Sequence, residues 1–88
     1  WAGIPGGDFV RCGLADLSSG RTSVESLLVS IGAPRLERLG IAVPRPIPSP
    51  ELRLYELLSE EDSDAAHSRY NALIRRLVSF ERAAECAR

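Results

Sequence analysis

The chain has 88 residues, of which 44% are hydrophobic and 26% are charged, and its net charge is −1. This length predicts one domain, and the composition is typical of a globular protein. A balanced charge provides no long-range attraction to nucleic acid or anionic lipid, and no apolar run approaches the ~20 residues that a membrane span requires. A chain of this size buries only about 60% of the surface that its unfolded form exposes, so a partner subunit would add stability.

Arginine supplies all 11 basic side chains, and methionine is absent. We interpret this lysine-free composition as that of a bacterial protein from a GC-rich genome. Cys12 and Cys86 are far apart in the chain and form no disulfide framework, so we expect reduced thiols and a cytoplasmic location. Because there is no initiator methionine, the chain is expected to be trimmed or to be part of a longer one.

The pattern of apolar residues predicts an all-α fold, a small bundle of four to five helices in a single domain over residues 1–88. No strand pattern and no internal repeat interrupts it. We expect an irregular arm, short helices, a Pro-rich strap and two longer helices, in that order, over residues 1–7, 8–40, 41–49 and 50–87.

The short helices are marked by their expected caps. Asp8 is expected to cap the first helix, in which Gly13 costs about 1 kcal/mol of helix stability relative to Ala. Thr22 and Glu25 form a T-x-x-E capping box for the second helix. A third short helix is expected over residues 34–39.

A Pro-rich strap precedes the fourth helix. Prolines at positions 44, 46, 48 and 50 exclude helix and favour extended polyproline II structure, and their spacing does not fit the PxxP pattern of peptide ligands. We expect the strap to lie over the core through Ile47, and Ser49 and Pro50 to open the fourth helix. Apolar residues lie almost all around that helix, which is typical of burial between neighbours: Leu52, Leu54, Tyr55, Leu57 and Leu58.

The last helix is the best-patterned element of the chain. We expect it to begin within the acidic residues 60–64 and to run to residue 87. Its predicted core stripe recurs at helical spacing: Ala66, Tyr70, Leu73, Leu77, Phe80 and Ala84.

A flank of the last helix is the predicted interaction surface. It consists of small side chains and two arginines: Arg69, Ala72, Arg76, Ser79 and Ala83. Small residues let another helix approach closely, and the arginines would pair with the acidic residues 60–64 of a second copy around a two-fold axis. The alternative is a solvated face with local ion pairs.

Other functions find less support in the residues. A helix-turn-helix over residues 22–41 would direct Arg35 and Arg38, with Arg75 and Arg82, toward nucleic acid, but no basic stripe accompanies them. His67, the single histidine, would serve a small enzyme or enzyme subunit as a base, but no nucleophile or orienting partner stands with it in a motif.

No paired ligand spacing indicates a metal or cofactor site, and we expect no catalytic residue. Trp1 is expected either to anchor on a partner or to cover the protein's own core. The sequence thus predicts a non-enzymatic module that associates with itself, as a homodimer, or with another protein, without nucleic acid or membrane as a partner.

Overall fold

The computed structural model describes residues 6–86 and confirms the predicted all-α fold. Within this range the chain forms five helices and no strand. They are α1 (Gly7–Ser18), α2 (Val24–Ile31), α3 (Ala33–Arg38), α4 (Pro50–Glu61) and α5 (Ala66–Cys86). Trp1 and most of the expected arm lie outside the described residues, as does residue 87 at the expected end of the last helix.

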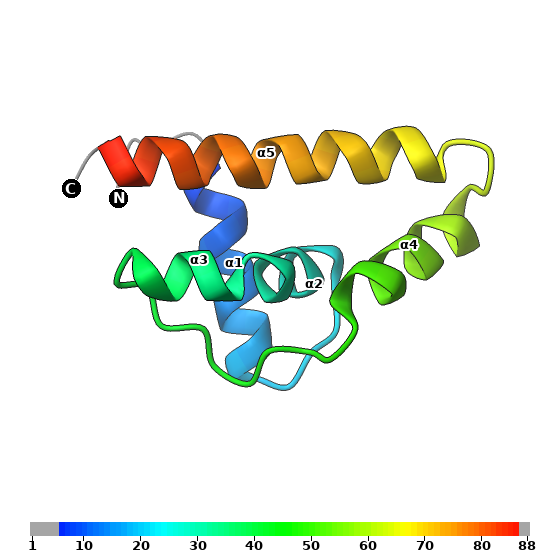
Figure 1. The fold of residues 1–88 in the computed structure, drawn as a ribbon. Helices are drawn as coiled ribbons and strands as arrows, with labels where there is room; N and C mark the ends of the chain where they lie inside the picture. The colour runs from blue at the N-terminus through cyan, green and yellow to red at the C-terminus, as the bar shows by residue number, and fades with distance from the viewer. Residues whose placement is uncertain (1–5, 87–88) are drawn as a thin grey trace.

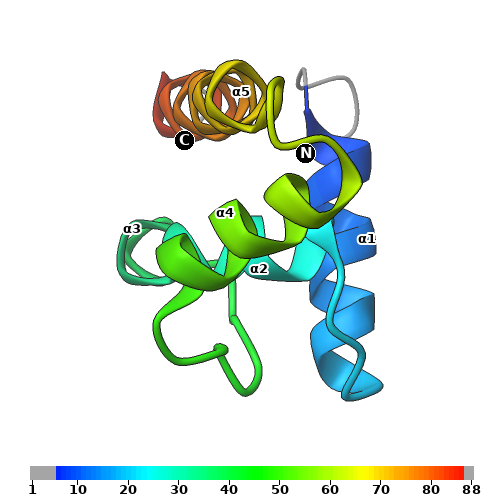
Figure 2. The ribbon, with the colours of Figure 1, turned by 90° about the vertical axis from the view of Figure 1, so that its right-hand side faces the viewer.

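The long helix α5 lies across the other helices (Figure 1). α1 and α2 cross one another beneath α5, α3 follows α2 alongside α5, and α4 rises from this base to the start of α5. The end-on view of α5 in Figure 2 places α1 on one side of the molecule and α3 on the other, with α4 running across the front between them. The two sides of α5 therefore have different neighbours.

The core is formed by apolar side chains from all five helices. On the α1 side, Phe80 of α5 is fully buried in a cluster with Val10 of α1 and Val29 of α2. Toward α4, Leu54 and Leu77 belong to a second buried cluster, which α2 also joins. The core stripe predicted for α5 is buried at Ala66, Leu77, Phe80 and Ala84, whereas Tyr70 and Leu73 are half-buried.

Helices α1 and α2 cross at Gly13, where their backbones nearly touch. A Cβ atom at position 13 would lie 2.5 Å from the carbonyl oxygen of Glu25 and 2.9 Å from Cγ1 of Val29. Any larger residue would force the two helices apart. The glycine that weakens α1 as a helix is thus the residue that lets α2 pack against it.

The first two helix caps differ from their predictions. α1 begins at Gly7, after Gly6 with a φ of 85°, so Asp8 lies in its first turn and does not cap it. α2 is capped by Ser23 and not by Thr22, because Ser23 and Ser26 each accept a hydrogen bond from the other's backbone N–H, at 3.0 and 2.7 Å. The Ser23 hydroxyl also donates to Oδ2 of Asp16 at 2.7 Å, which ties this cap to α1.

The Pro-rich strap lies over the core through Ile47, as predicted. Ile47 contacts both core clusters, and its backbone N–H donates to Oγ of Ser30 at 3.0 Å. The expected uniform polyproline II conformation is wrong at two positions, because Arg45 and Ser49 have φ values of 44° and 49°. Ser49 does precede α4 as predicted, but its side chain makes no capping hydrogen bond.

The acidic residues after α4 form a turn instead of the first turn of α5. Oδ1 of Asp62 accepts hydrogen bonds from the backbone N–H groups of Asp64 and Ala65, at 3.1 and 3.3 Å. The Asp62 side chain thus holds residues 62–65 in a turn of the Asx type. α5 therefore begins at Ala66, later than expected.

The prediction that α4 is buried all round is wrong. Leu54 and Leu58 are fully buried, but Leu52 is 63% exposed and Tyr55 is 39% exposed. With neighbours on only part of its circumference, α4 leaves two large apolar side chains on the surface. They are the large hydrophobic side chains that stand exposed within residues 6–86.

Candidate functional site

A groove runs between α5 and the corner where α2 turns into α3. Its volume is about 250 Å³. One wall comes from the α2–α3 corner and the other from α5. The lining residues are Ile31, Gly32, Pro34, Arg35, Arg38, Ile74, Leu77, Val78 and Glu81.

The chain turns at this corner because Pro34 interrupts the helix. Proline has no N–H to donate to the carbonyl four residues earlier, and its ring would clash with that carbonyl. α2 therefore ends at Ile31, and α3 starts at Ala33 with Pro34 in its first turn. The turn leaves Ile31 and Pro34 facing α5 across the groove.

Gly32 allows this corner to approach α5 closely. A Cβ atom on Gly32 would lie 2.9 Å from Oε2 of Glu81 and 3.0 Å from Cδ1 of Leu77. These neighbours are the ends of flexible side chains, unlike the backbone that faces Gly13. The floor of the groove is therefore closed by side-chain ends and not by backbone.

The buried carboxylate of Glu81 is the unusual group in the groove. Only 6% of its side chain is exposed, and its Oε1 lies 3.8 Å from Nη1 of Arg35. Arg35 makes a shorter bond to Glu85, 2.9 Å from Nη2 to Oε2. Within residues 6–86, Glu81 thus has one distant cationic partner, which it shares with a second carboxylate.

The environment of Glu81 disfavours its charge. Burial raises the pKa of the Glu81 carboxyl above its ordinary value, and the positive charge of Arg35 opposes part of that rise. An ionised carboxylate in an apolar groove is costly unless it is paired. Glu81 was missed in the sequence because it is polar, although it follows the buried Leu77 by four residues and so lies on the same face of α5.

Apolar residues continue from the groove toward α4. Tyr70, Ile74 and Val78 follow one another by four residues along α5, and all three are half-buried. The ring of Tyr70 packs edge-on against Tyr55 of α4, with 5.8 Å between centroids. Burial, and then the negative charge of Glu51, raise the pKa of Tyr70, which places Glu51 beside the same aromatic pair.

The flank predicted as the interaction surface lies on the other side of α5. Ala72 and Ser79 are exposed, and Ala83 is half-buried. Nη1 of Arg69 lies 3.2 Å from Oε2 of Glu61 in the same chain. The guanidinium of Arg76 lies 5.0 Å from the ring centroid of Phe9, a cation–π contact with α1. Both arginines are thus already engaged within their own chain.

Residues of the alternative functions are not brought together. His67 is exposed, and its Nε2 lies 3.2 Å from Nδ2 of Asn71. Arg35 is bonded to α5, and α3 has only six residues, while Arg75 and Arg82 are exposed on α5. Cys12 and Cys86 are free and exposed. No group of three side chains within residues 6–86 is arranged to hold a metal ion.

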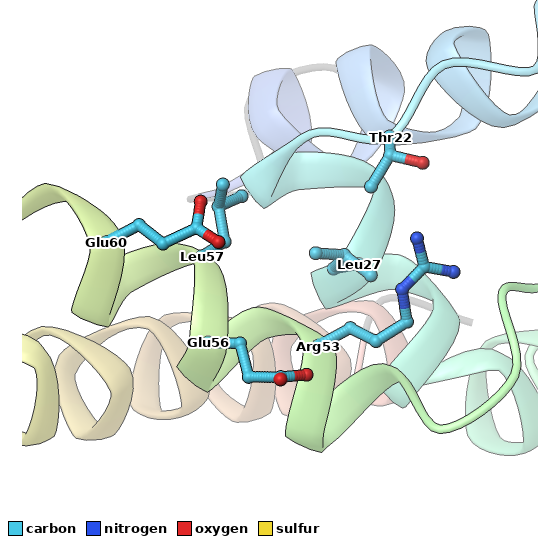
Figure 3. Close-up of a pocket in the computed structure, with 6 residues that line it drawn as sticks. All are labelled: Thr22, Leu27, Arg53, Glu56, Leu57 and Glu60. Atoms are coloured by element: carbon cyan, nitrogen blue, oxygen red, sulfur yellow. The ribbon is translucent and has the colours of Figure 1, made fainter.

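A second hollow, of about 220 Å³, lies between α4 and the start of α2 (Figure 3). Its lining residues are Thr22, Leu27, Arg53, Glu56, Leu57 and Glu60. Four of the six side chains belong to exposed residues, and Leu27 is the buried one. It lacks a buried charged group such as Glu81, so the groove beside α5 is the better candidate for a binding site.

Comparisons with known proteins give the chain no family: no family model, curated protein or solved structure matches it. None of the helices within residues 6–86 combines the length and the apolar character needed to cross a bilayer. Function must therefore be argued from the groove and its surroundings.

Proposed function

We propose that the protein is a protein–protein interaction module and that the groove beside α5 receives an apolar segment of the partner. The observation that supports this most is the apolar lining of an open groove, formed by Ile31, Pro34, Ile74 and Val78. Such a cleft between helices is the kind of surface on which an amphipathic helix lays its apolar face. Catalysis has less support, because no nucleophile and base meet at the groove.

The groove is favoured over the predicted flank of α5 for a physical reason. Binding through the flank would require Arg69 to leave Glu61 and Arg76 to leave Phe9, or to act from where they are. Binding in the groove would remove the half-buried Ile74 and Val78 from water. Each Å² of apolar surface so buried contributes about 25 cal/mol.

A pair of variants on opposite sides of α5 tests this proposal. Proteins captured from the source cells by the wild-type chain would be compared with those captured by Val78→Glu, in the groove, and Ala72→Glu, on the flank. A partner lost with Val78→Glu and kept with Ala72→Glu would then be purified, and its affinity for all three proteins measured by calorimetry. The proposal is wrong if every purified partner, a second copy included, binds Val78→Glu as well as wild type.

A further inference from the structure

The exposed edge of α4 is apolar, which is the property expected of an occupant of the groove. We define this edge as the ridge formed by Leu52 and Tyr55, which are 63% and 39% exposed. The two residues are three apart and so project together from α4. Large apolar side chains that remain exposed next to one another commonly mark an interaction site.

The ridge and the groove border each other on one face of the molecule. α4 begins on the same side of the molecule as α3 and then runs across toward α1 (Figure 2). Tyr55 of the ridge contacts Tyr70, and Ile74, one turn further along α5, already lines the groove. A projecting and a receiving surface thus adjoin on the same chain, which is the arrangement that two copies need to exchange contacts around a two-fold axis.

Charges around the two surfaces are complementary in part, since the groove also holds the carboxylate of Glu81, and Glu85 lies beside the groove residue Arg35. Glu51 and Glu56 flank the ridge, since each is four residues from one of its members. Both are exposed, and neither makes an ion pair within residues 6–86. On α5, Arg82 follows the groove residue Val78 by four residues, is exposed, and likewise makes no ion pair in the described part of the chain. Acidic groups beside the ridge would meet a basic group beside the groove.

We infer that the occupant of the groove is the Leu52–Tyr55 ridge of a second copy, and that two copies exchange this contact to form a two-fold symmetric dimer. This rests on the proposed function and names its partner. Each dimer contains two equivalent contacts, in which Leu52 of one copy lies between Ile74 and the α2–α3 corner of the other. Glu51 and Glu56 then lie near the partner's Arg82, which orients the ridge in the groove.

Sedimentation velocity of the purified chain tests this inference. From about 10 µM to about 1 mM, the range in which a modest interface dissociates, the wild type is expected to shift from monomer to dimer. Leu52→Glu places a charge in the apolar contact and is expected to weaken the dimer about 100-fold or more. Leu52 is exposed, so this variant keeps its fold, which circular dichroism would verify.

The groove variant and a mixing experiment make the test specific. Val78→Glu is expected to weaken the dimer as Leu52→Glu does, with Val78→Ala as a milder substitute if the charge disturbs folding. An equimolar mixture of the two variants is expected to dimerise more strongly than either alone, because an intact ridge then meets an intact groove in one of the two contacts. A dimer with unrelated contacts would show no such recovery.

The flank variant supplies the control and the contrary outcomes. Ala72→Glu is expected to dimerise like wild type. A wild type that stays monomeric at about 1 mM overturns the second copy as occupant. A dimer lost with Ala72→Glu but kept with Leu52→Glu overturns it as well and assigns the contact to the flank. Monomeric wild type leaves the proposed function standing, because capture and purification of another partner tests that separately.

Discussion

Gly13 lets α2 approach α1 and Gly32 lets α2 approach α5, but the atoms that meet at the two glycines differ. At Gly13 the close approach is to backbone, the carbonyl of Glu25 2.5 Å from the position of an added Cβ. At Gly32 the nearest atoms are the tips of Glu81 and Leu77, at 2.9 and 3.0 Å. The first seam is closed by backbone, and the second by the ends of two side chains. The candidate binding site lies at the second seam.

The largest expected difference in stability is between two variants of α5, one on each side of the helix. Phe80→Ala empties a fully buried site on the α1 side and is expected to lower the free energy of unfolding by about 3–5 kcal/mol. Val78→Ala, on the groove side, is expected to lower it by about 1 kcal/mol or less, since Val78 is only half-buried. Urea unfolding followed by circular dichroism measures both. Equal losses would mean that the two sides of α5 are packed alike.

The next largest effect on stability is expected from alanine substitutions at the two glycines. Gly13→Ala is expected to destabilise the protein by roughly 2–3 kcal/mol, because backbone must shift to admit the methyl group. Gly32→Ala is expected to cost about 1 kcal/mol or less, because the side chains of Glu81 and Leu77 can rotate away. The same unfolding measurement compares them. A larger loss at Gly32 would show that the groove seam is as rigid as the α1–α2 crossing.

The smallest effect is a dependence on pH at Glu81. Its pKa is raised in the folded state above the ordinary 4.5, so folding favours the protonated form. The cost of ionising it is absent below that value and grows as the pH rises through the window from 4.5 to the raised pKa. Wild type is therefore expected to lose stability relative to Glu81→Gln as the pH rises above 4.5, and unfolding between about pH 4 and about pH 7 would follow this loss.

Urea unfolding of the two proteins across this pH range measures the difference directly, so that the other carboxylates cancel. Glu85→Gln, which removes the exposed partner of Arg35, is the matched control. A free-energy difference that stays constant with pH would show that the groove does not penalise the Glu81 charge.

Local patterns predicted the helices well because each depends on nearby residues. The apolar spacing of α5 indicates a helix from nearby residues alone, and the third helix expected over residues 34–39 differs from α3 by one residue at each end. Caps were predicted less well, since Thr22 and Ser23 are both able to cap α2 and the choice depends on Asp16, in another helix. The start of α5 was misplaced because Asp62 binds backbone N–H groups in a turn.

The groove could not be predicted from the sequence, and the reason is different. Apolar residues all around α4 indicate burial only if neighbours exist on every side, and the fold leaves Leu52 63% exposed. Glu81 lies on the buried face by helical spacing, but its burial depends on how closely the corner at Gly32 approaches. That distance is set by tertiary packing, which one sequence does not reveal. The predicted flank remains a prediction, and its two arginines contact Glu61 and Phe9 of the same chain.

The hydroxyl oxygen of Ser30, in α2, makes hydrogen bonds both within its own helix and to the Pro-rich strap. It donates to the carbonyl of Ser26 at 2.8 Å and accepts the N–H of Ile47 at 3.0 Å. Ile47 lies outside every helix, yet its amide is held by a buried serine. Its hydrogen should therefore exchange with solvent slowly, at a rate set by detachment of the strap from α2. The exchange rate of this one backbone amide thus reports how often the strap detaches from α2.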